Sequence, residues 1–173
     1  MNNLKLITVS GLPGSGKSTL AECIAKALKI PVFSVDPIES SILKSGIPRS
    51  FETGLAAYLV AETLAAEQLK LRSSVVLDAV SAVKEARQMW RDLAEKYGAQ
   101  WVVIECVLEP VLHRQRIESR VRKIHGIPEV TWEDVERSRK EYLPWDQERL
   151  VLDSADAIEK NLEKARIFID AFQ

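Results

Sequence analysis

The sequence predicts an α/β fold in which helices cover both faces of a five-stranded parallel sheet. Two observations lead to this prediction. Five short apolar runs, typical of buried strands, alternate along the chain with longer segments whose apolar residues recur at helical spacing. The sequence also contains no internal repeat, low-complexity tract or linker, so residues 1–173 are expected to form a single domain.

The expected strands are compact apolar runs at 4–9, 31–35, 75–77, 101–108 and 149–152. A first helix is expected after the glycine-rich turn at 11–16, and the later ones at 37–44, 51–72, 81–97, 109–123, 131–142 and 156–172. Capping chemistry sets several ends: Ser81 is expected to begin the helix that Gly98 ends, and Thr131 with Asp134 forms a capping pattern. The carboxyl ends of parallel strands meet at one edge of a sheet, where ligands gather.

The composition argues against several classes of protein. Hydrophobic residues make up 46% and charged residues 28% of the chain, as in ordinary globular proteins. The net charge of −1 argues against a strongly basic nucleic-acid binder. No apolar run approaches the roughly 20 residues of a membrane span, and no signal peptide is recognisable. Cys23 and Cys106 have no C-x-x-C partner and are expected to be core thiols, so the sequence predicts a cytoplasmic protein.

The glycine-rich turn carries the strongest functional signal. Residues 11–19 read Gly-Leu-Pro-Gly-Ser-Gly-Lys-Ser-Thr and match the phosphate-binding P-loop pattern G-x-x-x-x-G-K-[ST]. Its glycines allow consecutive N–H groups to approach phosphate oxygens. Lys17 is expected at the β- and γ-phosphates and Ser18 at Mg²⁺. The predicted cofactor-binding residues are Gly11, Pro13, Gly14, Ser15, Gly16, Lys17, Ser18 and Thr19.

Two aspartates follow the second and third expected strands. Asp78 has the position of a metal-binding acid and is expected to hold Mg²⁺ with Ser18; a helix cap or turn is the alternative. Asp36 can accept the proton of an attacking hydroxyl, and its alternative role is to cap the next helix. The loop at 44–53, which includes Arg49, is the expected edge of an acceptor-binding site.

A basic segment follows the fourth expected strand. Arg116 and Arg120 share a helix face with His113, which leaves the two arginines able to clamp a phosphate. The alternative is a solvated basic helix face. His113 and His125 lack metal-ligand spacing and are both expected at the surface.

Together these features resemble the P-loop kinases of small molecules. Within them the chain is most similar to the branch of zeta toxins, polynucleotide kinases and chloramphenicol phosphotransferases, often labelled AAA-type ATPase domains. The resemblance rests on residues 11–19, on strands ending at Asp36 and Asp78, and on the arginines at 116–120, and it covers nearly the whole chain. It implies a three-layer P-loop NTPase fold with strand order 2-3-1-4-5, MgATP as donor, Asp36 as base and a mobile arginine-bearing lid at about 110–130. Polynucleotide kinases tend to carry an arginine one turn after the aspartate, whereas here Glu39 stands there.

The sequence therefore predicts an ATP-dependent kinase that phosphorylates a hydroxyl of a small molecule. ATP and Mg²⁺ are the expected cofactors, and Lys17, Asp36, Arg116 and Arg120 are the expected catalytic residues, with Asp36 and Arg49 touching the substrate. Two alternatives remain: a nucleotide-dependent switch without a small-molecule acceptor, and a kinase of nucleic-acid 5′-hydroxyls. GTP also remains open as the donor.

Overall fold

The computed structural model describes residues 4–119 and 128–172. Its centre is a parallel sheet of five strands in the order β2-β3-β1-β4-β5. This confirms the α/β class and the strand order that the resemblance implies. The strands are β1 (Lys5–Ser10), β2 (Val32–Ser34), β3 (Val75–Asp78), β4 (Gln100–Val107) and β5 (Leu150–Asp153).

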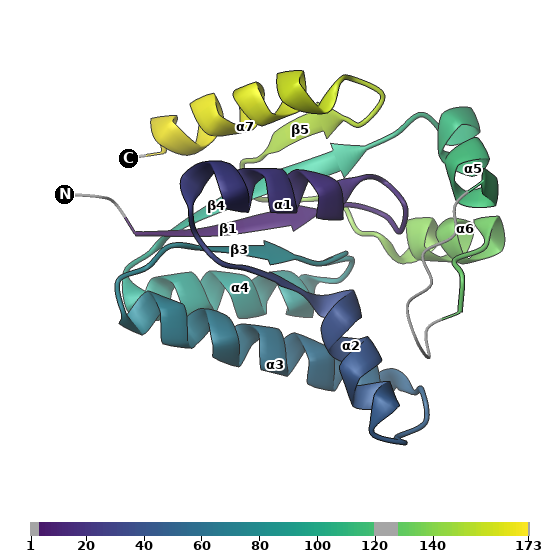
Figure 1. The fold of residues 1–173 in the computed structure, drawn as a ribbon, viewed down its shortest axis with the longest axis horizontal. Helices are drawn as coiled ribbons and strands as arrows, with labels where there is room; N and C mark the ends of the chain where they lie inside the picture. The colour runs from purple at the N-terminus through teal and green to yellow at the C-terminus, as the bar shows by residue number, and fades with distance from the viewer. Residues whose placement is uncertain (1–3, 120–127, 173) are drawn as a thin grey trace.

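Helices form the outer two layers. On one face lie α1 (Lys17–Leu28) and α7 (Ile158–Ala171), and on the other lie α3 (Phe51–Lys70) and α4 (Lys84–Tyr97), as Figure 1 shows. Because neighbouring residues of a strand point to opposite faces, Leu6 packs into the core under α3 and α4 while Ile7 packs into the core under α1 and α7. The strands therefore read as continuous apolar runs, as expected of a sheet covered on both sides.

The remaining helices lie at the carboxyl ends of the strands. α2 (Val35–Lys44) follows β2 and packs against α3, while α5 (Pro110–Ser119) and α6 (Trp132–Glu141) lie beyond the arrowheads of the strands in Figure 1. In the described part of the chain, no helix is long and apolar enough to cross a membrane.

The structure confirms some of the predicted helix ends and contradicts others. Gly98 ends α4 with a left-handed φ of 62°, and Thr131 with Asp134 forms the capping box that begins α6, as predicted. The prediction that Ser81 caps α4 is wrong, because α4 begins at Lys84 and Ser81 is buried with φ 49°. Its hydroxyl instead accepts a hydrogen bond from the indole Nε1 of Trp90 at 3.2 Å.

Candidate active site

The glycine-rich turn joins β1 to α1 and has the geometry of a phosphate cradle. Gly11, Gly14 and Gly16 have φ values of 149°, 77° and 94°, which other residues rarely adopt. Space is equally restricted, because a Cβ on Gly11 would lie 2.5 Å from the carbonyl oxygen of Cys106. Lys17 is the first residue of α1, so the backbone N–H groups of the turn and the positive end of the helix point to the same place.

A cavity of about 370 Å³ opens beside this turn. Its walls include Lys17, Ser18 and Thr19 from α1, and Asn161 of α7. Arg116 of α5 and Ser154 also line this cavity. The Nη2 of Arg116 donates a hydrogen bond to the carbonyl oxygen of Ser154 at 3.0 Å. The guanidinium therefore faces the cavity that the phosphate-binding turn also lines.

Helix α5 rests directly on the turn through His113 and Ile117. The Nε2 of His113 lies 2.8 Å from the carbonyl oxygen of Pro13, and because a carbonyl can only accept, this nitrogen carries the hydrogen. Burial lowers the pKa of His113, which favours the neutral ring. A Cβ on Gly14 would lie 2.3 Å from Cδ1 of Ile117. The prediction of a surface His113 is wrong, because its partner lies 100 residues earlier in the chain and the sequence does not show that contact.

Helix α6 brings in an arginine that the sequence reasoning missed. The ring of Trp132 meets that of His113 edge-on at 5.6 Å, which ties α6 to α5. The guanidinium of Arg139 lies 5.4 Å from the Trp132 ring centre, and Arg139 lines a second hollow with Gly11, Ser15 and His113. Helical spacing does not distinguish Arg139 from the other charged residues of α6.

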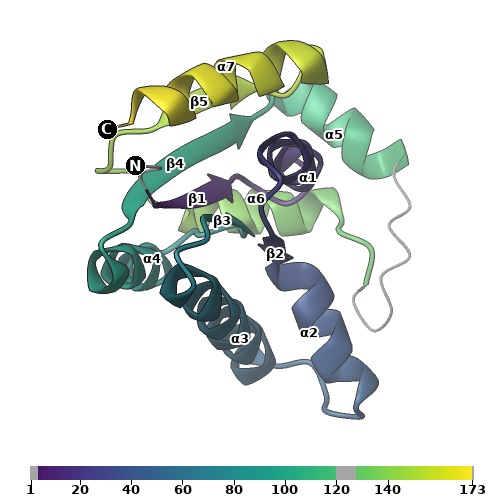
Figure 2. The same cartoon turned by 60° about the vertical axis from the view of Figure 1, so that its left-hand side comes forward.

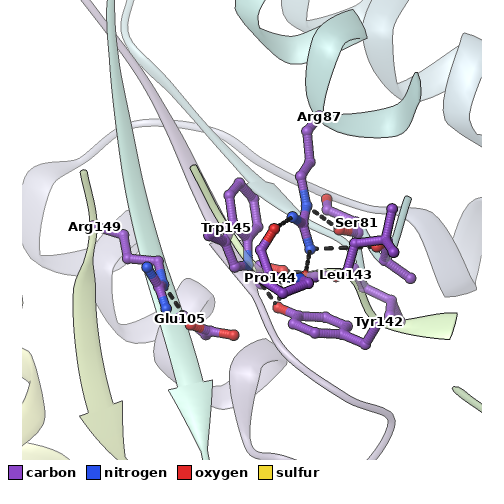
Figure 3. Close-up of polar contacts among 11 residues, drawn as sticks. Ser81, Arg87, Glu105, Tyr142, Leu143, Pro144, Trp145 and Arg149 are labelled. Atoms are coloured by element: carbon purple, nitrogen blue, oxygen red, sulfur yellow. Dashed lines mark hydrogen bonds and ion pairs between the residues drawn. The ribbon is translucent and has the colours of Figure 1, made fainter. Parts of the chain in front are cut away.

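The segment after α6 is fastened by Arg87, another residue that sequence reasoning missed (Figure 3). Arg87 donates hydrogen bonds to the carbonyl oxygens of Leu143 at 2.6 Å and Pro144 at 2.8 Å, and its guanidinium lies 3.9 Å from the ring centre of Trp145. The hydroxyl of Tyr142 in turn lies 3.0 Å from that of Ser10, the last residue of β1. The chain leaving α6 is thus held at the residue that precedes the phosphate-binding turn.

The two predicted aspartates stand on the same side of the turn. Asp78 ends β3, pairs in register with Val9 of β1 and Ser34 of β2, and is 4% exposed. Its Oδ1 has no hydrogen-bond partner among the described residues. Asp36 lies in the first turn of α2, because α2 begins at Val35 and not, as predicted, at residue 37. Its carboxylate therefore sits near the positive end of a helix.

The carboxylates of Asp36, Asp78 and Glu39 act electrostatically on the phenol of Tyr58 in α3. Burial and, to a smaller extent, the negative charges of these three carboxylates together raise the pKa of Tyr58 to about 12. The Tyr58 hydroxyl therefore stays protonated at neutral pH, and it accepts a hydrogen bond from the backbone N–H of Ser81 at 3.1 Å. Tyr58 cannot be recognised as a site residue from the sequence, because the groups that act on it come from other elements.

Tyr58 also lines a further cavity, of about 450 Å³. Glu39 and Arg49 line it, and the Nε of Arg49 is 3.6 Å from a carboxylate oxygen of Glu39. Arg49 thus lines a cavity, as expected of the loop at 44–53, and Glu39 is buried.

Most of the predicted site residues line one of three hollows. Gly14, Gly16, Lys17, Ser18, Thr19 and Arg116 line one cavity, and Arg49 lines another. Gly11 and Ser15 face the hollow under α5 and α6, and the carbonyl of Pro13 is taken by His113. Arg120 lies outside the described residues, as does His125.

Comparisons with known proteins assign the family. The model of the AAA_33 family, described as an AAA domain, matches residues 6–143, so the chain belongs to this family. A UPF0200 protein from Aeropyrum pernix is 32% identical over 146 residues, which are 78% of this chain and 72% of that protein. The bifunctional polynucleotide phosphatase/kinase of Schizosaccharomyces pombe is 30% identical over 103 residues, which are 60% of this chain and only 20% of that protein.

Solved structures share the fold over nearly the whole chain. A gluconokinase from Sinorhizobium meliloti 1021 has a TM-score of 0.70 at 18% identity, covering 98% of this chain and 97% of that one. The APS kinase of Mycobacterium tuberculosis, in complex with AMPPNP and APS, has a TM-score of 0.72 at 16% identity, covering 98% and 99%. At such identities the likeness shows the fold, which is that of the P-loop kinases.

Proposed function

We propose that this protein is an ATP-dependent phosphotransferase that moves the γ-phosphoryl group of ATP to a hydroxyl of a small molecule. The observation that carries the proposal is the order of groups along the sheet edge. The phosphate-binding turn follows β1, Asp78 ends the neighbouring β3, and Asp36 follows β2 beyond it. Two carboxylates thus follow or end the two strands on one side of β1, at the edge of the sheet where the turn lies, and Glu39 and Arg49, which follow Asp36 in the chain, line a second cavity. A switch without an acceptor has no need of that second cavity.

The proposed reaction uses the residues as follows. The acceptor oxygen forms a bond to the γ-phosphorus, the bond from that phosphorus to the β–γ bridging oxygen breaks, and ADP leaves. The hydroxyl proton passes to the carboxylate of Asp36. The N–H groups of the turn and the ammonium of Lys17 hold phosphate oxygens, while Arg116 offers a guanidinium to the charge that spreads over them. Arg120 is a second candidate for this role.

The residues present fit a magnesium ion. A buried carboxylate oxygen without a donor, such as Oδ1 of Asp78, is stabilised by a cation. Ser18 and Asp78 would hold Mg²⁺, which when bound neutralises charge on the β- and γ-phosphate oxygens. Mg²⁺ takes most of its ligands from phosphate and water, so a site of this kind needs few ligands from the protein.

Proteins of the same fold support the proposal of an ATP-dependent phosphotransferase with a small acceptor. The APS kinase structure of this fold contains AMPPNP, an analogue of ATP. The gluconokinase of the same fold is named for a small hydroxylated substrate. Glu39, one turn after Asp36, is buried and paired with Arg49, which favours a small acceptor over a polyanionic nucleic acid.

Two substitutions test the proposal. Lys17→Ala should weaken ATP binding at least about tenfold in calorimetric titration, because it removes the cation at the phosphates. Asp36→Asn should retain the ATP dissociation constant and lower acceptor phosphorylation by about 10²-fold or more. The exposed Asp146→Asn serves as control and should behave as the parent. Parent-like phosphoryl transfer by Asp36→Asn, or release of inorganic phosphate alone with every acceptor, would refute the proposal.

A further inference from the structure

The cavity of about 450 Å³ is built mainly from hydrocarbon. It lies at the N-terminal part of α3, between α2, the segment that follows β3 and the start of α4, and Figure 2 shows α2 beside α3. Its apolar lining includes Phe51, Leu55, Tyr58, Val80, Val83 and Met89. A cavity of this volume is of the size that encloses a drug-sized molecule.

Several of these apolar side chains are exposed, which folding alone does not explain. Phe51 is 80% exposed, and Leu55 and Val83 are 42% and 41% exposed. Phe51 is the first residue of α3, where the capping box of Ser50 and Thr53 already fixes the helix start whatever side chain follows Ser50. The large aromatic side chain of Phe51 does not pack into the hydrophobic core, so it is available to contact a bound molecule.

The floor of the cavity is rigid and its lining is partly acidic. The ring of Tyr58 stacks on that of Trp90, with centroids 5.7 Å apart and planes 20° apart, and its hydroxyl is held by the N–H of Ser81. Glu39 places a carboxylate in the lining, and the negative charges of Asp36, Asp78 and Glu39 act on the Tyr58 hydroxyl. A molecule in the cavity therefore meets mainly hydrocarbon, with a carboxylate among its few polar contacts.

This lining selects among hydroxylated molecules. The polar side chains of the lining are those of Glu39, Arg49, Ser50 and Glu85. Hydroxyls of a sugar or polyol that lie instead against Leu55, Val83 and Met89 would lose water without gaining a partner. A flat ring system has few hydrogen bonds to water, so removing it from water costs little free energy, and it can lie against the exposed ring of Phe51. Only one short polar arm is needed to reach the polar part of the lining.

We propose that the acceptor is an alcohol with a flat aromatic body, the class to which nucleosides belong. The inference rests on the phosphotransferase function proposed above and adds the class of its substrate. The hydroxyl on the polar arm supplies the oxygen that bonds to the γ-phosphorus and gives its proton to Asp36. The ring lies in the cavity between Phe51 and Tyr58.

The first experiment compares matched acceptors with the full chain, ATP and Mg²⁺. Thymidine, uridine and tyrosol represent aromatic alcohols, gluconate, glucose and glycerol represent polyols, and a short oligonucleotide presents a 5′-hydroxyl on nucleic acid. We expect kcat/KM for at least one aromatic alcohol to exceed that for every polyol by about tenfold or more. Preference for a polyol or for the oligonucleotide would overturn the inference and leave the phosphotransferase proposal standing. If no acceptor is phosphorylated, saturation-transfer NMR decides, since absence of ring contacts from all three aromatic alcohols would also overturn it.

The second experiment fills the cavity. Gly54 lines it within α3, and a Cβ there would meet no heavy atom within 4 Å, so Gly54→Leu adds bulk to the cavity without a clash at its root. Thr63→Leu is the matched control, because Thr63 is exposed and lies nine residues further along the same helix, on the opposite face. We expect Gly54→Leu to raise KM for the aromatic acceptor about tenfold or more with KM for ATP and the melting temperature retained, and Thr63→Leu to leave all three unchanged. An unchanged acceptor KM in Gly54→Leu would overturn the placement of the ring.

Discussion

Replacing Arg87 by Met tests whether this buried guanidinium holds the segment after α6 to the rest of the fold. Arg87 is 5% exposed, and it donates hydrogen bonds to the carbonyl oxygens of Ser81, Ala82, Leu143 and Pro144 at 2.9, 3.3, 2.6 and 2.8 Å. Met fills much of the same volume but donates nothing. The change therefore leaves four carbonyl groups without this donor.

The expected loss of stability follows from those contacts. Hydrogen bonds to a charged group contribute about 1.5–3 kcal/mol each, but the contributions of one side chain do not add. Part of the gain is offset by the cost of burying the cation. We expect Arg87→Met to lower the free energy of unfolding by about 3–5 kcal/mol, which for a chain of this length is a fall of about 6–20 °C in melting temperature.

Urea unfolding followed by circular dichroism measures this change. Arg91→Met is the matched control on the same helix, because the Arg91 side chain is 35% exposed and lies 3.7 Å from an exposed carboxylate, that of Asp146. Arg91→Met should lower the free energy of unfolding by less than about 1 kcal/mol. Arg87→Lys should recover only part of the stability, since an ammonium cannot reproduce the planar fork. If Arg87→Met unfolds within about 1 kcal/mol of the parent, the fastening role of Arg87 is wrong.

Two more predictions concern the contact between α5 and the phosphate-binding turn. Gly14→Ala should cost at least about 1–2 kcal/mol in urea unfolding, because φ is 77° there and the new Cβ would lie 2.3 Å from Cδ1 of Ile117; parent-like stability would show that α5 does not rest on the turn. His113 makes stability depend on pH, since burial lowers its pKa in the folded state below the 6.5 of the free side chain. The unfolded chain then binds the proton more readily, so the contribution is fully present above about pH 6.5 and is lost as the pH falls towards the folded-state pKa. The stability difference between the parent and His113→Gln should therefore shrink from pH 7.5 to pH 5.5, and a constant difference would contradict the reasoning.

The sequence by itself determined the parts of this protein that depend on neighbouring residues. Apolar runs and helical periods are local patterns, so the strands and most helices could be read directly, as could residues 11–19, whose chemistry requires glycines and a lysine at fixed spacing. Asp36 and Asp78 each follow or end a strand, and parallel strands end on the same side of a sheet. The sequence was therefore sufficient to predict that both aspartates lie at the carboxyl edge of the sheet. Helix ends were read less well, as Ser81 and the start of α2 show.

The tertiary structure alone decided which side chains meet across long stretches of chain. The hydrogen bond of His113 to Pro13, those of Arg87 to Leu143 and Pro144, and the effect of the three carboxylates on Tyr58 all join residues far apart in the sequence. Each depends on helix orientation and side-chain direction, which no short pattern encodes. The P-loop pattern could therefore be recognised from nine consecutive residues, 11–19. The second cavity became visible only once α2, α3 and α4 had packed, because its walls come from separate helices that are brought together by burying their other faces.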